Sequence, residues 1–511
     1  MTRWLSPKLW AAIGPGLFLV ALAFHSPVIS PDAVEMAETG RCLWLQTVGA
    51  SACEGLELWF WPPLFPLIVG AISLVSGVEP TVVGVGLSAL SWALVVWLVV
   101  DLLRLWIGER LPWACALFPP LLLAVPTFAA YVQNGEARGL GLAFLLLALR
   151  STVRMRRSHP AERMASIRVG LCIAMACLCR PEYLLPSGLL LAWRVWVFRS
   201  PWAPGGFLLL MTPYWALLSR QAGQFTVTSR DWLANVGGWL ALFPDEWVRM
   251  ELAAGARDTP VRRVVSTVSD EADKRLGLEW GEVGTFAEFV FLDTLPVALS
   301  AFALVGAVVA WRIASRRLLF GILLVLAPSV GSLVLLRVGD TVLPLNNLLP
   351  FVVLLALFTS ITVGWGVAAW SERASSDQAD RVVSVLLICL CWWLAVRSPP
   401  PVSLLSSEAG AAATSWLGEQ STSKIGVTFA SAPIVLRSGH VRTRIPAPWS
   451  VPAWLEQPPD RLVLSSLDLP ATLASLRTME RVVGLSTEVV FEDDAGWVAV
   501  MKVTAPAADS Q

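Results

Sequence analysis

The chain has 511 residues, of which 56% are hydrophobic and 15% charged, and its mean hydropathy is +0.65. Charged residues make up about 25% of an ordinary soluble protein, so this composition excludes a soluble enzyme and indicates a polytopic helical membrane protein. The formal net charge is zero, which gives no reason to expect a nucleic-acid partner.

The first apolar run, from Leu9 to Phe24, follows Arg3 and Lys8 and so has the pattern of a signal peptide. We favour a retained transmembrane helix, because many further stretches of spanning length follow. Together they predict about eleven transmembrane helices, with the basic loops between them on the cytoplasmic side. The candidate spans are 9–29, 80–106, 112–131, 134–154, 169–193, 204–220, 289–311, 318–337, 343–370 and 382–398.

The segment 169–193 is predicted to enter and leave the membrane on the same side. A single crossing there would place the basic sequence WRIASRR, residues 311–317, outside the cytoplasm. Pro181 and Pro186 interrupt the segment, so we expect two short half-helices that meet near CRPEYLLP.

The acidic and irregular segments then lie on the outer face. They are a first outer loop at 30–79, a long outer loop at 221–288 and a tail at 399–511, which leaves 1–398 as the transmembrane domain. Within the first loop, the apolar stretch 60–77 is predicted to form a helix in the outer interface, with its double proline at the start.

Two of the eight cysteines, Cys42 and Cys53, fall in the first outer loop, and the other six fall in predicted spans. A disulfide between Cys42 and Cys53 would be stable outside the cytoplasm. Two unpaired cysteines in amphipathic helices are the alternative.

The tail, 399–511, is predicted to be a small soluble α/β domain. KIGVTFA, RLVLSS, TEVVFED and GWVAVMKV have the pattern of short strands, with helical segments near 450–457 and 470–479. This tail contains no glycine-rich phosphate loop, histidine cluster or nucleophile motif, so we expect it to serve packing or acceptor binding.

Charges interrupt two of the predicted spans. Only about 16 Å of apolar helix separates Arg138 from Arg150, against about 30 Å of hydrocarbon, so the helix should extend outward through Arg138 and Glu136. Those two side chains should then lie close to the membrane boundary and face protein or a wet cavity rather than lipid. The alternative is an Arg138 that snorkels to the interface with Glu136 as its ion-pair partner. Arg180 and Glu182 lie deep in an apolar segment, where they either pair with each other or line a polar cavity for an anionic head group.

Acids and arginines together form a set that is approached from outside. Without a histidine or cysteine cluster, the set suggests proton abstraction beside phosphate binding rather than a metal site. The candidate residues are Asp32, Glu35, Glu57, Glu136, Arg138, Arg180, Glu182 and Arg337.

Five segments in order, SPDAVEMAETGRCL, WPPLFPLIVGAISLVSG, NGEARGLGLAFLLLAL, CRPEYLLP and VLPLNNLLPF, resemble the GT-C membrane glycosyltransferases. These enzymes use polyprenyl-phosphate sugars and include protein O-mannosyltransferases and aminoarabinose transferases. The resemblance covers most of residues 1–400, and a soluble α/β tail also recurs in bacterial relatives. It implies a multi-pass protein of the bacterial inner membrane, with its active site and tail on the periplasmic side.

The resemblance also assigns roles. Asp32 matches the family's acidic residue after the first helix, the expected catalytic base, and Glu136 matches a second acid that we assign to acceptor positioning. Arg138 and Arg180 match basic positions in the corresponding segments. Arg337 and Glu57 match more loosely, because an Arg-Tyr pair is missing at the first and the spacing differs at the second.

The implied reaction moves a sugar from a polyprenyl-phosphate donor to a lipid, glycan or protein acceptor, with inversion at the anomeric centre. Some GT-C enzymes use a divalent cation, but no ligand cluster here indicates one. Two other functions remain open: a non-catalytic GT-C-like subunit for lipid binding or assembly, and a membrane transporter. The sequence does not identify the sugar, the isoprenoid, the acceptor or the oligomeric state.

Overall fold

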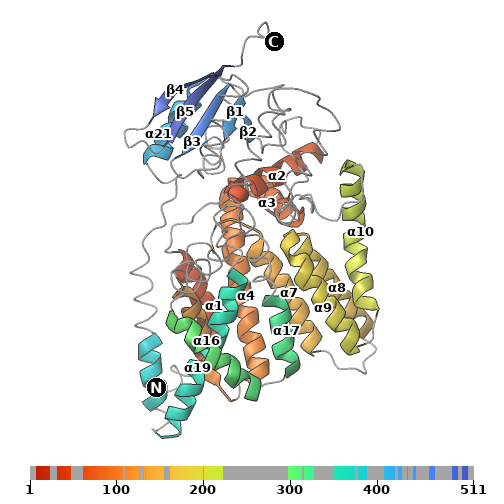
Figure 1. The fold of residues 1–511 in the computed structure, drawn as a ribbon, viewed down its shortest axis with the longest axis vertical. Coiled ribbons are helices and arrows are strands. Elements are labelled where there is room, and N and C mark those ends of the chain that lie inside the picture. The colour runs from red at the N-terminus through yellow and green to blue at the C-terminus, as the bar shows by residue number, and fades with distance from the viewer. Residues whose placement is uncertain are drawn as a thin grey trace, which may run out of the picture.

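The structure is a computed structural model, and it combines a helical bundle with a five-stranded sheet (Figure 1). The sheet lies at the end of the molecule where α2 and α3 lie. The structure describes residues 7–23, 31–47, 61–107, 110–125, 128, 132, 134–154, 162–198, 201–222, 297–313, 316–326, 349–373, 378–387, 408–420, 424–427, 434, 441–444, 460–465, 486–492 and 498–504.

The first five labelled helices are α1 (Pro7–Ala23), α2 (Pro31–Thr47), α3 (Leu64–Ser76), α4 (Pro80–Ile107) and α5 (Pro112–Leu123). Proline begins α2, α4 and α5, where its fixed φ suits the first turn and its missing N–H costs no hydrogen bond. A helix is present within the predicted stretch 60–77, as α3, and its location in a membrane interface stays a prediction. The sequence did not predict α2, which makes the acidic segment after α1 helical.

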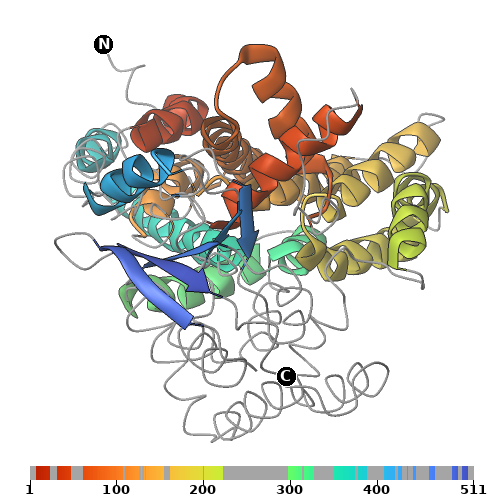
Figure 2. The same ribbon diagram turned by 90° about the horizontal axis from the view of Figure 1, so that it is seen from above.

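The helices α2 and α3 lie across the end of the bundle, at an angle to α4 (Figures 1 and 2). They pack closely because two glycines face each other where they cross. A Cβ on Gly40 would lie 1.9 Å from the carbonyl oxygen of Pro66, and a Cβ on Gly70 would lie 2.3 Å from that of Gly40. No larger residue fits at either position without moving a backbone.

The next helices are α7 (Arg138–Arg154), α8 (Glu162–Cys177), α9 (Leu184–Phe198) and α10 (Trp202–Ala222), with a short 3₁₀ helix, η2 (Pro181–Tyr183), between α8 and α9. Arg180 is extended, with φ −153° and ψ 135°. A residue before proline disfavours the helical region, so Pro181 ends the helical path here. The predicted break at CRPEYLLP is therefore confirmed, and α8 packs beside α7, α9 and α10.

The later helices are α16 (Val297–Ile313), α17 (Arg316–Leu326), α19 (Leu349–Ser371) and a helix over 378–387. The helix α19 packs against α16 and α5, and these helices share one large apolar core with α4, α7 and α8. By length and composition alone, α4 and α19 are the described helices that could cross a membrane, and α1, α3, α5 and α16 hold shorter apolar stretches. The count of about eleven spans stays a prediction.

The sheet is built from β1 (Lys424–Val427), β2 (Val441–Arg444), β3 (Arg461–Ser465), β4 (Ser486–Glu492) and β5 (Val498–Thr504), in the order β2-β1-β3-β5-β4. The strand β1 is parallel to β2 and β3, whereas β5 is antiparallel to β3 and β4. The four predicted strands are present. The strand β2 and the helix α21 (Glu408–Gly418), which packs on β5, were not predicted, and 450–457 and 470–479 lie outside the described residues.

We predict that Gly40→Ala lowers the stability of the protein. The added methyl group must push α2 away from α3, which should cost about 1 to 3 kcal/mol of unfolding free energy. The thermal midpoint of the purified protein in detergent measures this effect. Gly86→Ala in α4 is the matched control, because nothing lies within 4 Å of its Cβ. Equal thermal midpoints for Gly40→Ala and Gly86→Ala would contradict the close packing of α2 against α3 at Gly40.

Candidate active site

A tight turn precedes α7 and carries the first part of the site. Gly135 has φ +80°, which glycine adopts without strain, and the backbone N–H of Glu136 donates to Oδ1 of Asn134 over 3.1 Å. The helix therefore begins at Arg138. The expected span from residue 134, with Glu136 inside the helix, is wrong, because this side-chain bond and the left-handed glycine replace the first helical turn.

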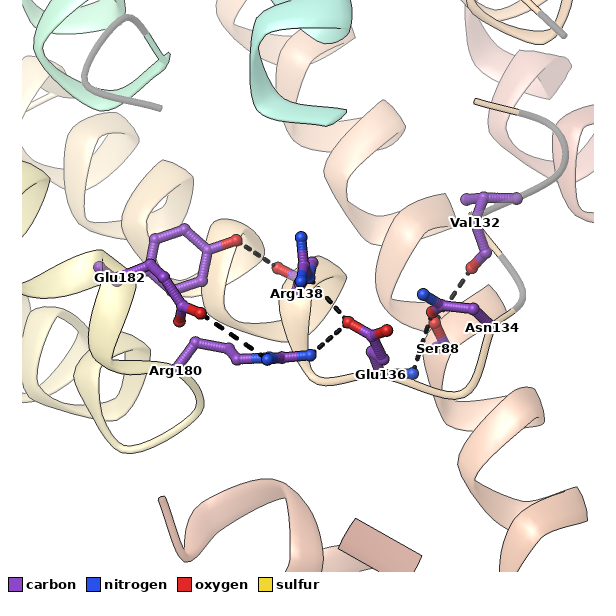
Figure 3. Close-up of polar contacts among 8 residues, drawn as sticks. Ser88, Val132, Asn134, Glu136, Arg138, Arg180 and Glu182 are labelled. Carbon is purple, nitrogen blue, oxygen red and sulfur yellow. Dashed lines mark hydrogen bonds and ion pairs between the residues drawn. The ribbon is translucent and has the colours of Figure 1, made fainter. Parts of the chain in front are cut away.

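The carboxylate of Glu136 binds two arginines through the same oxygen, Oε2 (Figure 3). Nε of Arg138 lies 2.7 Å from it, and Nη2 of Arg180 also donates to it. The exposed fractions are 2% for Glu136, 7% for Arg138 and 1% for Arg180. The expected pair of Glu136 and Arg138 is present, but it is buried instead of reaching toward water.

Arg180 also contacts two further side chains. Its guanidinium carbon lies 5.2 Å from the centre of the Trp61 ring, a cation–π contact, and Trp61 is 1% exposed. Its Nη1 lies 3.7 Å from Oε1 of Glu182, whose side chain is more exposed. Arg180 therefore pairs with both acids, but its contact with Glu182 is longer than its contact with Glu136, which lies 44 positions earlier in the chain.

Tyr183 links the break between α8 and α9 to the start of α7 through a hydrogen bond. Its hydroxyl donates to the backbone oxygen of Arg138 over 2.7 Å. Gly141 makes room for the ring, since a Cβ there would lie 2.3 Å from a ring carbon. The backbone N–H of Leu64, at the start of α3, donates to the carbonyl of Leu178 over 3.0 Å. These bonds bring three distant segments to one place.

The first turn of α2 reaches the same place. The Cβ of Ala33 lies 2.9 Å from where a Cβ on Gly135 would stand, so the helix turn that contains Asp32 touches the turn that carries Glu136. An apolar cluster, the outer cluster, extends this contact toward the hairpin break. Its buried members include Met36, Ala37, Trp61, Phe65, Val83, Ala137 and Cys179.

Other candidate residues are not placed by these contacts. Asp32 and Glu35 lie in α2, but their side chains are outside the described part of the structure, as are Glu57, Arg337 and Cys53 entirely. Cys42 is disulfide-bonded, and its partner lies outside the described residues, so the pairing with Cys53 stays a prediction. Within the described ranges, no group of three or more His, Cys, Asp or Glu could hold a metal ion.

The sequence alone missed three residues of the site: Trp61, Asn134 and Tyr183. Each lies within a segment that was singled out: Trp61 precedes the double proline, Asn134 precedes Glu136 by two positions, and Tyr183 follows Glu182. Their closeness in the sequence to the candidate charged residues was the only indication that they belong to the site. Together with the charged side chains they form a polar site inside an apolar bundle, with two guanidiniums suited to an anionic ligand.

No protein-family model matches the sequence, and none of the curated proteins matches it significantly. Solved structures do match. ArnT from Cupriavidus metallidurans, bound to undecaprenyl phosphate, is 14% identical with a TM-score of 0.53, and 97% of each chain is covered. The Archaeoglobus fulgidus oligosaccharyltransferase tethered to an acceptor peptide is 10% identical with a TM-score of 0.56, over 99% of this chain and 75% of that one.

The Archaeoglobus fulgidus protein, AglB, also matches in its complex with an inhibitory peptide and a dolichol-phosphate, with a TM-score of 0.52 at 10% identity and the same 99% and 75% coverage. These proteins are GT-C glycosyltransferases. At such identities the likeness concerns the fold. The chain is therefore similar in fold to these glycosyltransferases, whose family the five sequence segments resemble.

We predict strong coupling between Glu136 and Arg180 in a double-mutant cycle. Glu136→Gln should cost about 3 to 5 kcal/mol of unfolding free energy, because it leaves two buried guanidiniums without their shared carboxylate. Arg180→Met should cost less, because Glu136 keeps its ion pair with Arg138. The double variant should lose less than the sum of the two. Denaturation of the purified protein in detergent measures all three.

Arg154→Met is the control for this cycle. Arg154 also pairs with a carboxylate, Asp101, at 2.9 Å, but its side chain is 45% exposed. Removing such a pair should cost about 0 to 1 kcal/mol. If the double variant loses the full sum of the unfolding free energies that the two single variants lose, Glu136 and Arg180 do not interact, and the ion pair described above is contradicted.

Proposed function

We propose that this chain is a membrane glycosyltransferase that moves a sugar from a polyprenyl-phosphate donor to an acceptor on the extracytoplasmic face. The observation that carries the proposal is the buried cluster of Glu136, Arg138 and Arg180 against the first turn of α2. Two arginines and nearby acids are the groups that this reaction needs. The GT-C fold supports the same reading, since one neighbour binds undecaprenyl phosphate and another dolichol-phosphate.

The arginines act on the leaving group. A sugar linked to a lipid phosphate departs as a phosphate that is already anionic, so no general acid is required. What lowers the barrier is positive charge that is fixed beside the phosphate oxygens as the bond breaks. Arg138 and Arg180 supply it, and the Trp61 ring and the Glu136 carboxylate hold the Arg180 guanidinium in place before the donor binds.

Asp32 acts on the acceptor. Its carboxylate takes the proton from the acceptor hydroxyl or amine while that oxygen or nitrogen attacks the anomeric carbon. The bond from this carbon to the phosphate oxygen breaks, and the lipid phosphate leaves with the electron pair. A single displacement inverts the anomeric centre. Asp32 belongs in this role because its helix turn touches the Glu136 turn.

The remaining candidates complete the substrate site. Glu136 keeps the acceptor-positioning role that the sequence suggested, and its contacts add a second role, to orient the arginines. Glu35, Glu57, Glu182 and Arg337 are assigned to substrate binding. No divalent cation is assigned.

The donor's lipid tail explains the location of the site. A polyprenyl chain stays in the bilayer, so its head group must enter sideways, at the outer boundary of the helices. We place the chain in the bacterial plasma membrane as a multi-pass protein, with the cluster and residues 399–511 on the periplasmic side. The acceptor then approaches from the aqueous side.

Asp32→Asn should abolish transfer. Purified protein is incubated with radiolabelled polyprenyl-phosphate sugars, and sugar transfer or release is followed over time. Loss of a general base should reduce turnover by about 10²- to 10⁴-fold while lipid binding persists. Asp101→Asn is the control carboxylate, because Asp101 pairs with Arg150 and Arg154 and has no part in the site.

The other outcomes separate the alternatives. Turnover that Asp32→Asn leaves intact would remove Asp32 from the mechanism. If no donor turns over but polyprenyl phosphate still binds, the chain is a non-catalytic lipid-binding subunit. Substrate uptake into vesicles without consumption of the lipid sugar would identify a transporter.

A further inference from the structure

Asn134 is a buried amide with half of its hydrogen-bonding capacity unused. It is 2% exposed, and its Nδ2 has no hydrogen-bond partner among the described residues. Its Oδ1 accepts the N–H of Glu136. That bond also fixes which end of the amide is which, because a flipped amide would set an NH₂ group against a backbone N–H.

The turn does not need the NH₂ group. The carbonyl of Val132, two residues earlier, accepts from the Ser88 hydroxyl over 3.0 Å, so another residue satisfies this carbonyl. A serine or an aspartate would serve the Glu136 N–H as well as asparagine does. A buried donor left without an acceptor is costly, which makes asparagine an unfavourable choice for structure alone.

The position of the amide indicates what it serves. Figure 3 shows the amide nitrogen of Asn134 pointing to the side on which the Glu136 carboxylate and the Arg138 guanidinium lie. Next to this residue, Gly135 touches Ala33, in the helix turn that contains Asp32. The unused N–H groups therefore point toward the proposed phosphate-binding arginines, and the next residue along the chain contacts α2.

We propose that Asn134 Nδ2 donates a hydrogen bond to an oxygen of the lipid-phosphate sugar, and that this residue is a donor-binding residue of the site. The inference rests on the proposed function. An amide NH₂ can only donate, so its ligand atom is an acceptor, either a sugar oxygen or a phosphate oxygen. Its neutral charge suits it to fix the orientation of the donor beside arginines that supply the charge.

Two substitutions test this role. Asn134→Ser and Asn134→Asp both keep an oxygen for the Glu136 N–H and both remove the NH₂ donor. Each should weaken binding of the intact polyprenyl-phosphate sugar to purified protein about tenfold or more, because a buried polar contact is lost. Thermal midpoints of the ligand-free proteins, measured in parallel, report any damage to the fold.

Binding of the same polyprenyl phosphate without a sugar distinguishes the two sources of oxygen. If Nδ2 contacts the phosphate, Asn134→Ser weakens binding of both lipids by similar factors. If Nδ2 contacts the sugar, it weakens binding of only the sugar-bearing lipid. Ser88→Ala is the matched control, since it removes the neighbouring Ser88–Val132 bond and should leave both affinities unchanged.

Unchanged affinities for both lipids in Asn134→Ser and Asn134→Asp would overturn the proposal and make the amide structural. Losses that Ser88→Ala reproduces would also overturn it. Because the readout is binding, it is separate from the transferase assay. A wild-type protein that binds these lipids without turnover would defeat the proposed function and still decide the role of Asn134.

Discussion

One carboxylate shared by two guanidiniums inside an apolar bundle is the constraint on which the site depends. Each ion costs several kcal/mol to remove from water, so Glu136, Arg138 and Arg180 are tolerated only when all three meet. Their meeting requires the Gly135 turn, the start of α7 and the break between α8 and α9 to arrive together. The Tyr183 hydrogen bond makes that arrangement specific, because it joins the break directly to the backbone of α7.

The helix α2 and the segment that carries Trp61 pack against this charged cluster. Trp61 covers Arg180 with its ring and belongs to the same apolar cluster as Met36 and Ala37 of α2. Packing that cluster sets the first turn of α2 on the Gly135 turn. The position of the helix turn that contains Asp32, against the Gly135 turn, is therefore a consequence of apolar burial.

The sequence predicted features whose cause is local. Proline chemistry located the break at Pro181 and the start of α3, and alternation located four strands. It failed where the cause is distant. The sequence left open whether Arg180 pairs with Glu182 or lines a polar cavity, and it did not indicate that the closest carboxylate, Glu136, lies 44 residues earlier. The start of α7 was misplaced because a left-handed Gly135 and the Asn134 side chain outweigh the helical pattern, and only coordinates reveal that φ.

In the proposed reaction, the shared carboxylate also explains how the phosphate site stays stable while no donor is bound. Two buried guanidiniums with no counter-ion would destabilise the fold each time the lipid phosphate departs. Glu136 provides a resident anion that holds both arginines in orientation, so a donor phosphate would enter a site whose groups are already placed. Such preorganisation lowers the barrier, because no group has to be reoriented as charge develops on the leaving phosphate. In the proposed reaction, the contact that makes the fold possible and the contact that prepares catalysis are the same.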